Sequence, residues 1–213
     1  MAHLNRPQAR EGCIDRETAL PRLAVLVSGG GTNLQALLDS CCRGDLNADV
    51  AIVVGDRPGT RAIERAAAAG VRTEVIDRKS AGPELSAEIL KVIGRDLDLI
   101  VLAGFLSRIT DPLLESYRGR IINIHPALLP DFGGPGMYGR KVHEAVLAAG
   151  REETGCTVHY VDTGMDTGPV ILQKRMPVRD DDTPDSLARR LRPLEHQALV
   201  EAVRQVVAEK ASS

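Results

Sequence analysis

The segment best suited to chemistry is residues 120–130, which read RIINIHPALLP. Asn123 and His125 stand two residues apart at the end of an apolar run typical of a strand, so their side chains point to the same face. An imidazole can donate or accept a proton near neutral pH, and an amide can donate a hydrogen bond to a developing oxyanion. Taken alone, the pattern is better explained by a core histidine beside a hydrogen-bonded asparagine. A metal site is disfavoured, because no second His or Cys stands nearby at ligand spacing.

A second polar segment, residues 159–169, reads HYVDTGMDTGP and joins two stretches with strand character. It contains two carboxylates, Asp162 and Asp166. A carboxylate in such a loop could orient a histidine and raise its pKa by opposite-charge stabilisation. An ordinary Asp-Gly turn is the more frequent origin of such residues. The spacing, without a closing Glu, does not match a calcium-binding EF-hand.

A third segment, SGGGTN at residues 28–33, lies between an apolar run and a helical pattern. Glycines allow the backbone to approach a phosphate, and the N-terminus of a helix offers N–H groups without intrahelical partners. The segment is neither a Walker loop nor G-x-G-x-x-G, which weakens the case for a nucleoside triphosphate or a dinucleotide. A tight turn with a capping Thr or Asn explains it about equally well.

The elements that must position these segments follow from the hydrophobic pattern. Short apolar or alternating runs predict strands at residues 23–27, 50–54, 72–76, 99–103, 120–124, 154–161 and 170–178. Helices are predicted at residues 32–42, 59–70, 83–97, 141–149 and 183–207, with a short one opening near residue 110. Strands that alternate with helices predict an α/β fold: an open, mostly parallel twisted sheet with flanking helices. The last two strands, with no helix between them, predict a late antiparallel hairpin.

Composition limits the classes of protein further. The chain has 213 residues, a net charge of −2, 43% hydrophobic residues and 2% aromatic residues. Neither a basic excess nor an aromatic platform for stacking bases is present, so nucleic-acid and membrane partners are not expected. Residues 1–20 are polar and Arg-rich, without the apolar region of a signal peptide, and are interpreted as an N-terminal extension. Four cysteines without a C-x-x-C pair favour reduced thiols in a cytoplasmic protein.

The three polar segments, in this order, resemble those of the phosphoribosylglycinamide formyltransferase family. The resemblance covers about residues 22–208, and it is carried by Val27–Ala36, Ile63–Ala66, Val101–Phe105, Asn123–Pro126 with Leu128–Pro130, and Asp166–Pro169. The ordered set is highly specific for folate-dependent formyl transfer. Its glycine loop favours the branch that acts on glycinamide ribonucleotide. The resemblance implies a Rossmann-like formyltransferase fold in a single domain, residues 21–213. A phosphate-binding half would span about residues 21–120, and a folate and catalytic half about 121–213.

The implied activity is transfer of the formyl group of 10-formyltetrahydrofolate, as cosubstrate, to the amine of glycinamide ribonucleotide in purine biosynthesis. No metal is implied, and the partners would be small molecules, with the chain a monomer or homodimer. By resemblance, the catalytic residues are Asn123, His125 and Asp166. The ribonucleotide would bind to Gly31, Thr32, Asn33 and Glu195, and the folate to Leu106, Ser107, Arg108, Ile109 and Asn123.

The family often has an Arg between the third strand and the next helix, where this chain has Ala81. Arg78 and Lys79 are nearby but are not predicted to replace it. The loop at residues 131–140 is also richer in glycine than usual. Two alternatives stay open: another formyl-folate enzyme, such as a hydrolase or a tRNA formyltransferase, or a phosphate-binding module without catalysis.

Overall fold

The computed structural model describes residues 20–211, so the predicted N-terminal extension lies outside the described residues except for Leu20. A single seven-stranded sheet has the order β3-β2-β1-β4-β5-β6-β7. Its strands are β1 (Arg22–Val27), β2 (Asp49–Gly55), β3 (Thr73–Val75), β4 (Leu99–Leu102), β5 (Ile121–His125), β6 (Glu153–Tyr160) and β7 (Val170–Pro177). The first five are parallel, and β6 and β7 each run antiparallel to the strand before them. The predicted fold class, with its late hairpin, is confirmed.

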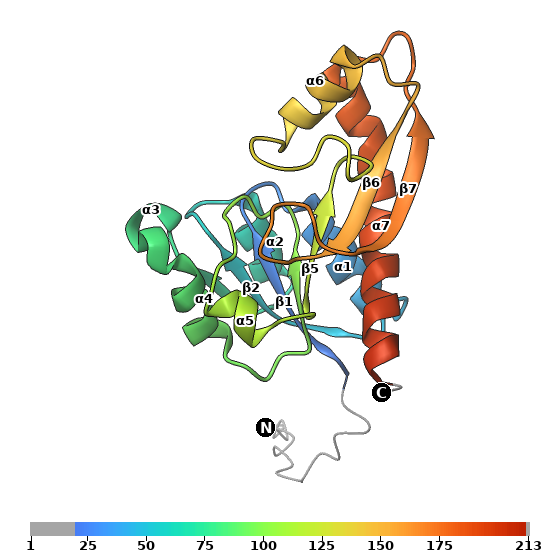
Figure 1. Ribbon diagram of the computed structural model, residues 1–213. Coiled ribbons are helices and arrows are strands. Elements are labelled where there is room, and N and C mark those ends of the chain that lie inside the picture. Colours follow the sequence, from blue (N-terminus) through green and yellow to red (C-terminus); the bar gives the residue numbers. More distant parts are fainter. Residues whose placement is uncertain (1–19, 212–213) are drawn as a thin grey trace, which may run out of the picture.

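Helices cover both faces of this sheet, as Figure 1 shows. They are α1 (Thr32–Cys42), α2 (Arg61–Ala68), α3 (Arg78–Ala81), the 3₁₀ helix η1 (Gly82–Glu84), α4 (Leu85–Ile93), α5 (Leu113–Ser116), α6 (Arg140–Ala148) and α7 (Pro184–Ala211). Successive residues of a strand point to opposite faces, so Val25 joins the core under α1, α2 and α7, while Leu26 joins the core under α4 and α5. Both cores consist mainly of buried aliphatic side chains, which fix the sheet and therefore the loops at its edge.

The predicted helix over residues 83–97 is wrong at both ends. Its regular part, α4, stops at Ile93, because Gly94 takes a left-handed φ of 72° and caps the helix. Before it, Asp77 accepts a hydrogen bond from the backbone N–H of Lys79 and starts the short helix α3, which the sequence pattern did not reveal. The remaining predicted elements exist, with ends shifted by a few residues.

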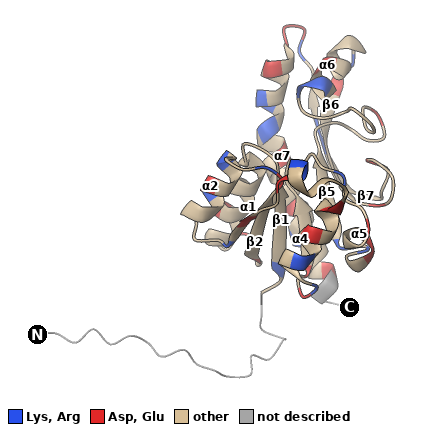
Figure 2. Cartoon of the chain, turned by 90° about the vertical axis from the view of Figure 1, so that its left-hand side faces the viewer, with Lys and Arg blue, Asp and Glu red and all other residues tan. Residues whose placement is uncertain are grey.

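Basic and acidic residues are interspersed along the helices seen in Figure 2, and the net charge of the whole chain is −2. Within residues 20–211, no helix has the length and apolar character that a membrane crossing requires. Cys41, Cys42 and Cys156 are free thiols. Burial raises the pKa of Cys156 to about 12, which suits a packing role.

Candidate active site

The carboxyl ends of the central strands β1, β4 and β5 open onto a cavity of about 570 Å³, which loops from the second half of the chain and α7 close on the other side. In open α/β sheets, this edge is where ligands bind. Every site residue predicted from the sequence lines this cavity, except Gly31: Thr32, Asn33, Leu106, Ser107, Arg108, Ile109, Asn123, His125, Asp166 and Glu195. Residues up to 163 positions apart in the chain are therefore gathered around one space, as the resemblance implied.

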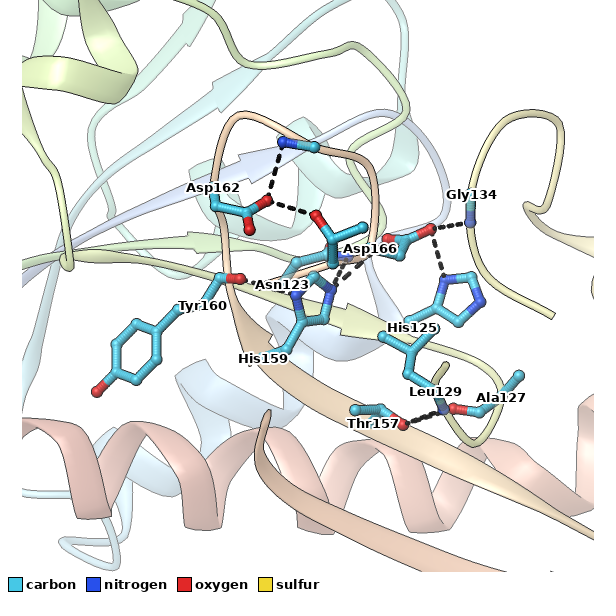
Figure 3. Close-up of polar contacts among 12 residues, drawn as sticks. Asn123, His125, Ala127, Leu129, Gly134, Thr157, His159, Tyr160, Asp162 and Asp166 are labelled. Carbon is cyan, nitrogen blue, oxygen red and sulfur yellow. Dashed lines mark hydrogen bonds and ion pairs between the residues drawn. The ribbon is translucent and has the colours of Figure 1, made fainter. Parts of the chain in front are cut away.

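Asp166 lies between two histidines at the centre of this site (Figure 3). Its Oδ2 atom is 3.6 Å from Nδ1 of His125, and its Oδ1 atom is 3.6 Å from Nε2 of His159. The backbone N–H of Gly134 donates to Oδ2 at 3.0 Å. Burial alone would raise the pKa of Asp166, but the neighbouring His125 and the hydrogen bond from Gly134 oppose burial, and the pKa lies below its ordinary value. The side chain is thus a carboxylate held in place from three sides.

The turn that carries Asp166 is built by the other carboxylate, Asp162. Its Oδ1 atom accepts hydrogen bonds from the backbone N–H of Gly164, at 2.9 Å, and from Oγ1 of Thr167, at 2.8 Å. Within this turn Asp166 has a φ of 58°, a left-handed conformation that is costly for a residue with a side chain. The turn therefore forces Asp166 into an orientation that faces the histidines.

His125 is 4% exposed at the end of β5. Its Nε2 atom is 2.8 Å from the carbonyl oxygen of Phe132. A carbonyl can only accept, so Nε2 carries the proton, and Nδ1, facing Asp166, is the nitrogen that can take one up. Burial lowers the pKa of His125, and the charge of Asp166 only partly opposes this. The carboxylate does raise the pKa of His125, as expected, but desolvation is the larger effect, so the net shift is downward and the resting imidazole is neutral at pH 7.

His159 is the central residue that the sequence analysis missed. It lies on β6 directly opposite Asn123, beside an irregularity in the β6–β7 pairing. Its Nδ1 atom is 2.8 Å from the carbonyl oxygen of Tyr160 and so carries the proton. Its Nε2 atom therefore accepts from Nδ2 of Asn123, at 3.1 Å. This contact orients the amide of Asn123 and leaves the second amide hydrogen available. The strand alternation was visible in the sequence, but the pairing register was not.

The predicted ribonucleotide residues meet at another wall of the cavity. Nδ2 of Asn33, at the start of α1, donates to Oε2 of Glu195, in α7, at 3.2 Å. Burial raises the pKa of Glu195, and the hydrogen bond from Asn33 partly offsets this. Arg192, one helical turn before Glu195, adds an exposed guanidinium to the same wall, and the sequence analysis did not single it out.

The predicted folate segment, residues 106–109, is held by three separate contacts. The backbone N–H of Leu106 donates to Oγ of Ser28 at 2.8 Å, and Oγ of Ser107 donates to Oδ2 of Asp56 at 2.6 Å. Nη2 of Arg108 donates to the carbonyl oxygen of Thr163 at 2.7 Å. The segment is therefore fixed to the glycine loop, to the end of β2 and to the turn of Asp162.

Near the missing family arginine, Ala81 ends α3. Nη1 of Arg78 lies 3.4 Å from the fully buried Asp56, so its partner is inside the protein. Neither Arg78 nor Ala81 lines the cavity. Arg78 thus serves the framework around residues 106–109 and does not stand in for the missing arginine.

Gly31 is needed for a reason other than ligand approach. It has a φ of 70°, and a Cβ atom there would lie 2.6 Å from Cα of Ala62 in α2. At Gly30, by contrast, a Cβ atom would have nothing within 4 Å. The glycine at position 31 is therefore required by packing and by backbone conformation.

We expect Gly31→Val to lower the free energy of unfolding by more than about 2 kcal/mol, through the left-handed backbone and the collision with α2. Gly30→Val, the matched control, should change it by less than about 1 kcal/mol. Urea unfolding of both variants, followed by circular dichroism, measures the difference. Equal stability of the two variants would contradict the packing role assigned to Gly31.

An open α/β sheet with a helix N-terminus and a partly buried Asn–His–Asp cluster at the carboxyl ends of its strands defines the class of small-molecule α/β enzymes. Among residues 20–211, no group of three or more His, Cys, Asp or Glu side chains could hold a metal ion. The sequence profile of the formyl transferase family matches residues 21–203. The chain belongs to the formyl transferase family.

Individual relatives agree with this assignment. Glycinamide ribonucleotide transformylase 1 from Geobacillus kaustophilus is 43% identical, with a TM-score of 0.81 over 88% of this chain and 99% of that one. A chloroplastic phosphoribosylglycinamide formyltransferase from Arabidopsis thaliana is 39% identical over 89% of this chain and 66% of its own length. A trifunctional purine biosynthetic protein from Drosophila melanogaster is 42% identical over 87% of this chain, which spans 14% of that protein. A formyltetrahydrofolate deformylase from Pseudomonas syringae, 24% identical with a TM-score of 0.80, shares the fold.

Proposed function

We propose that this protein transfers the formyl group of 10-formyltetrahydrofolate to the amine of glycinamide ribonucleotide. The observation that carries the proposal is the convergence of Asn123, His125 and Asp166 in the cavity that also contains the start of α1. A hydrogen-bond donor, a neutral imidazole and a carboxylate are the groups needed to move a formyl group from one nitrogen to another. Two of the relatives named above, from Geobacillus kaustophilus and Arabidopsis thaliana, carry this ribonucleotide in their names.

The ribonucleotide would bind with its phosphate at the N-terminus of α1. There Thr32 and Asn33 offer backbone N–H groups, and the helix end carries partial positive charge. Arg192 on the opposing wall would supply a full positive charge toward the same phosphate. Glu195, fixed by Asn33, would lie near the substrate amine and so orient the nucleophile.

The folate would bind along residues 106–109. The rim of the cavity there includes three exposed apolar side chains, Leu106, Tyr138 and Met165, which are 48%, 50% and 38% exposed. Exposed apolar groups around a cavity are typical of a surface that receives a flat hydrophobic ligand. The anchored backbone of residues 106–109 would supply hydrogen bonds to the edge of the pterin ring.

In the reaction, Asn123 would donate its free amide hydrogen to the formyl oxygen as negative charge develops on it. One such donor typically lowers the barrier by about 2.7–4 kcal/mol. A bond forms between the amine nitrogen and the formyl carbon, and the bond from that carbon to the folate nitrogen breaks. His125 would accept the amine's proton at Nδ1, where Asp166 stabilises the resulting imidazolium, and pass it to the departing nitrogen. No covalent bond to the protein is needed.

A spectroscopic assay of tetrahydrofolate release tests the proposal. We expect release only when glycinamide ribonucleotide and 10-formyltetrahydrofolate are both present. Release without the ribonucleotide would identify a hydrolase, and no release under either condition would identify a binding module. Either of these two results would overturn the proposed function.

A further inference from the structure

All three carbonyl groups of the glycine loop are bound by neighbouring helices. The carbonyl oxygen of Gly29 accepts from the backbone N–H of Ala62 at 3.0 Å, and that of Gly31 accepts from the N–H of Gln35 at 2.9 Å. The carbonyl oxygen of Gly30 has a side-chain donor instead, Nε of Arg65, at 3.0 Å. Among residues 20–211, Arg65 is therefore the one side chain that donates a hydrogen bond to a backbone carbonyl of this loop.

The orientation of these carbonyls determines where the loop's N–H groups point. Within residues 20–211, the cis peptide bonds are those before Pro112 and Pro130, so the glycine peptides are trans. In a trans peptide, the C=O of one residue and the N–H of the next point in opposite directions. Because the carbonyls of Gly29 and Gly30 face α2, the N–H groups of Gly30 and Gly31 face away from α2.

Arg65 is itself held in place while it makes this contact. Its Nη1 atom donates to Oε1 of Gln35, in the first turn of α1, at 2.9 Å. Its Cδ atom is 3.3 Å from the position that a Cβ atom would occupy at Gly31. The guanidinium thus joins α2, the glycine loop and α1. A peptide between two glycines has wide conformational freedom, so without this contact its orientation would not be fixed.

We propose that Arg65 is a positioning residue for phosphate recognition, which fixes the peptide between Gly30 and Gly31 so that its N–H faces the phosphate of the ribonucleotide. The inference rests on the proposed function and deepens it. Arg65 acts through the backbone, since its Nε and Nη1 atoms are bound to Gly30 and Gln35. Loss of Arg65 therefore disturbs the recognition of phosphate, whereas folate binding and the chemical step remain.

The test compares Arg65→Met with Arg61→Met. Arg61 lies one turn earlier on α2 and is exposed, so the two variants lose the same charge from the same helix. For Arg65→Met we expect kcat/KM for glycinamide ribonucleotide to fall by about 10- to 100-fold, through KM, because a hydrogen bond to a charged ligand is lost. The KM of Arg65→Met for 10-formyltetrahydrofolate should change less than about twofold. In Arg61→Met, kcat/KM for glycinamide ribonucleotide and KM for 10-formyltetrahydrofolate should both change less than about twofold.

The decisive comparison uses the same substrate without its phosphate, glycinamide riboside. Arg65→Met should leave kcat/KM for the riboside within about twofold of wild type, so that the preference for the phosphorylated substrate falls by about 10- to 100-fold. An equal loss for both substrates, or an unchanged preference, would overturn the role of Arg65. An equal loss of preference in Arg61→Met would overturn it too, because the effect would then be one of charge alone.

A second variant and a second readout cover loss of folding. Arg65→Lys keeps the charge but has one donor group in place of Nε and Nη1, so its phosphate preference should lie between those of wild type and Arg65→Met. If Arg65→Met does not fold, a preference in Arg65→Lys equal to wild type overturns the inference. Stabilisation by inorganic phosphate, measured as a shift in Tm, should be smaller in either variant than in wild type.

Failure of the proposed function would look different. If the wild-type protein did not release tetrahydrofolate in a ribonucleotide-dependent way, that result would refute the proposed function itself.

Discussion

Replacing His125 with alanine should lower kcat by about 10³-fold, within the range that a positioned acid–base group contributes. The variant loses the nitrogen that takes up the proton of the attacking amine. The KM for the ribonucleotide should change little, since Asn33, Glu195 and the start of α1 lie on another wall of the cavity. Steady-state assays of tetrahydrofolate release give kcat, and calorimetric titration of the variant with the ribonucleotide gives the affinity.

Two outcomes would contradict this role of His125. Turnover near that of wild type would remove the imidazole from the reaction. Loss of ribonucleotide binding together with turnover would show that the side chain supports the cavity instead. His125 is buried, so its truncation leaves a space at the end of β5 that could destabilise the fold. The control is therefore the Tm of the variant, which should lie close to that of wild type.

Asp166→Asn should lower kcat by about 10²- to 10³-fold while preserving the volume of the side chain. The amide cannot stabilise an imidazolium at His125, and its NH₂ group cannot accept from Gly134 as the carboxylate does. Binding of both substrates should be retained. The measurement is again kcat with ribonucleotide titration, and a kcat within about threefold of wild type would refute the role of Asp166.

The dependence on pH separates this role from a general loss of structure. In wild type, burial places the pKa of His125 below its ordinary value of 6.5. As the pH is lowered, kcat/KM should therefore stay constant down to 6.5 and decrease only at pH values below it. The charge of Asp166 raises the pKa of His125. Without the carboxylate, the acid limb of the profile should therefore move to lower pH. A limb that stays in place, or moves to higher pH, would show that the two side chains do not interact.

The free energy of unfolding should also depend on the ionisation of Asp166. The folded-state pKa of Asp166 lies below its ordinary value of 3.8, so its contribution to stability is complete above pH 3.8 and is lost as pH falls through the folded-state pKa. The stability difference between wild type and Asp166→Asn should accordingly shrink in that acidic range. Urea unfolding at a series of pH values measures it.

The parallel part of the sheet, and Asn123 and His125 in the cavity, could be predicted from the sequence because they depend on local signals. Apolar runs such as residues 99–103 identify buried strands, and polar residues directly after such runs must lie at the carboxyl edge of the sheet. Asn123 and His125 were found in this way, since their spacing of two places them on one face. The other site residues came from matching ordered motifs to a family.

What could not be predicted depends on contacts between distant segments. The position of His159 opposite Asn123 requires the register of β5 and β6, which no local pattern specifies. The protonation state of His125 depends on the balance between desolvation and the charge of Asp166, and that balance requires the depth of burial. The contact between Arg65 and Gly30 is similar, because it joins a helix to a loop 35 residues earlier.

The hydrogen bond between Asn33 and Glu195 spans 162 residues of chain, and one wall of the cavity depends on it. Contacts of such sequence separation form late, because a long loop must close before they stabilise anything. During refolding from urea, helical circular dichroism should therefore recover before enzymatic activity does. Recovered activity would then report the docking of the C-terminal helix α7. Before α7 docks, the refolding chain would have its secondary structure but no catalytic activity.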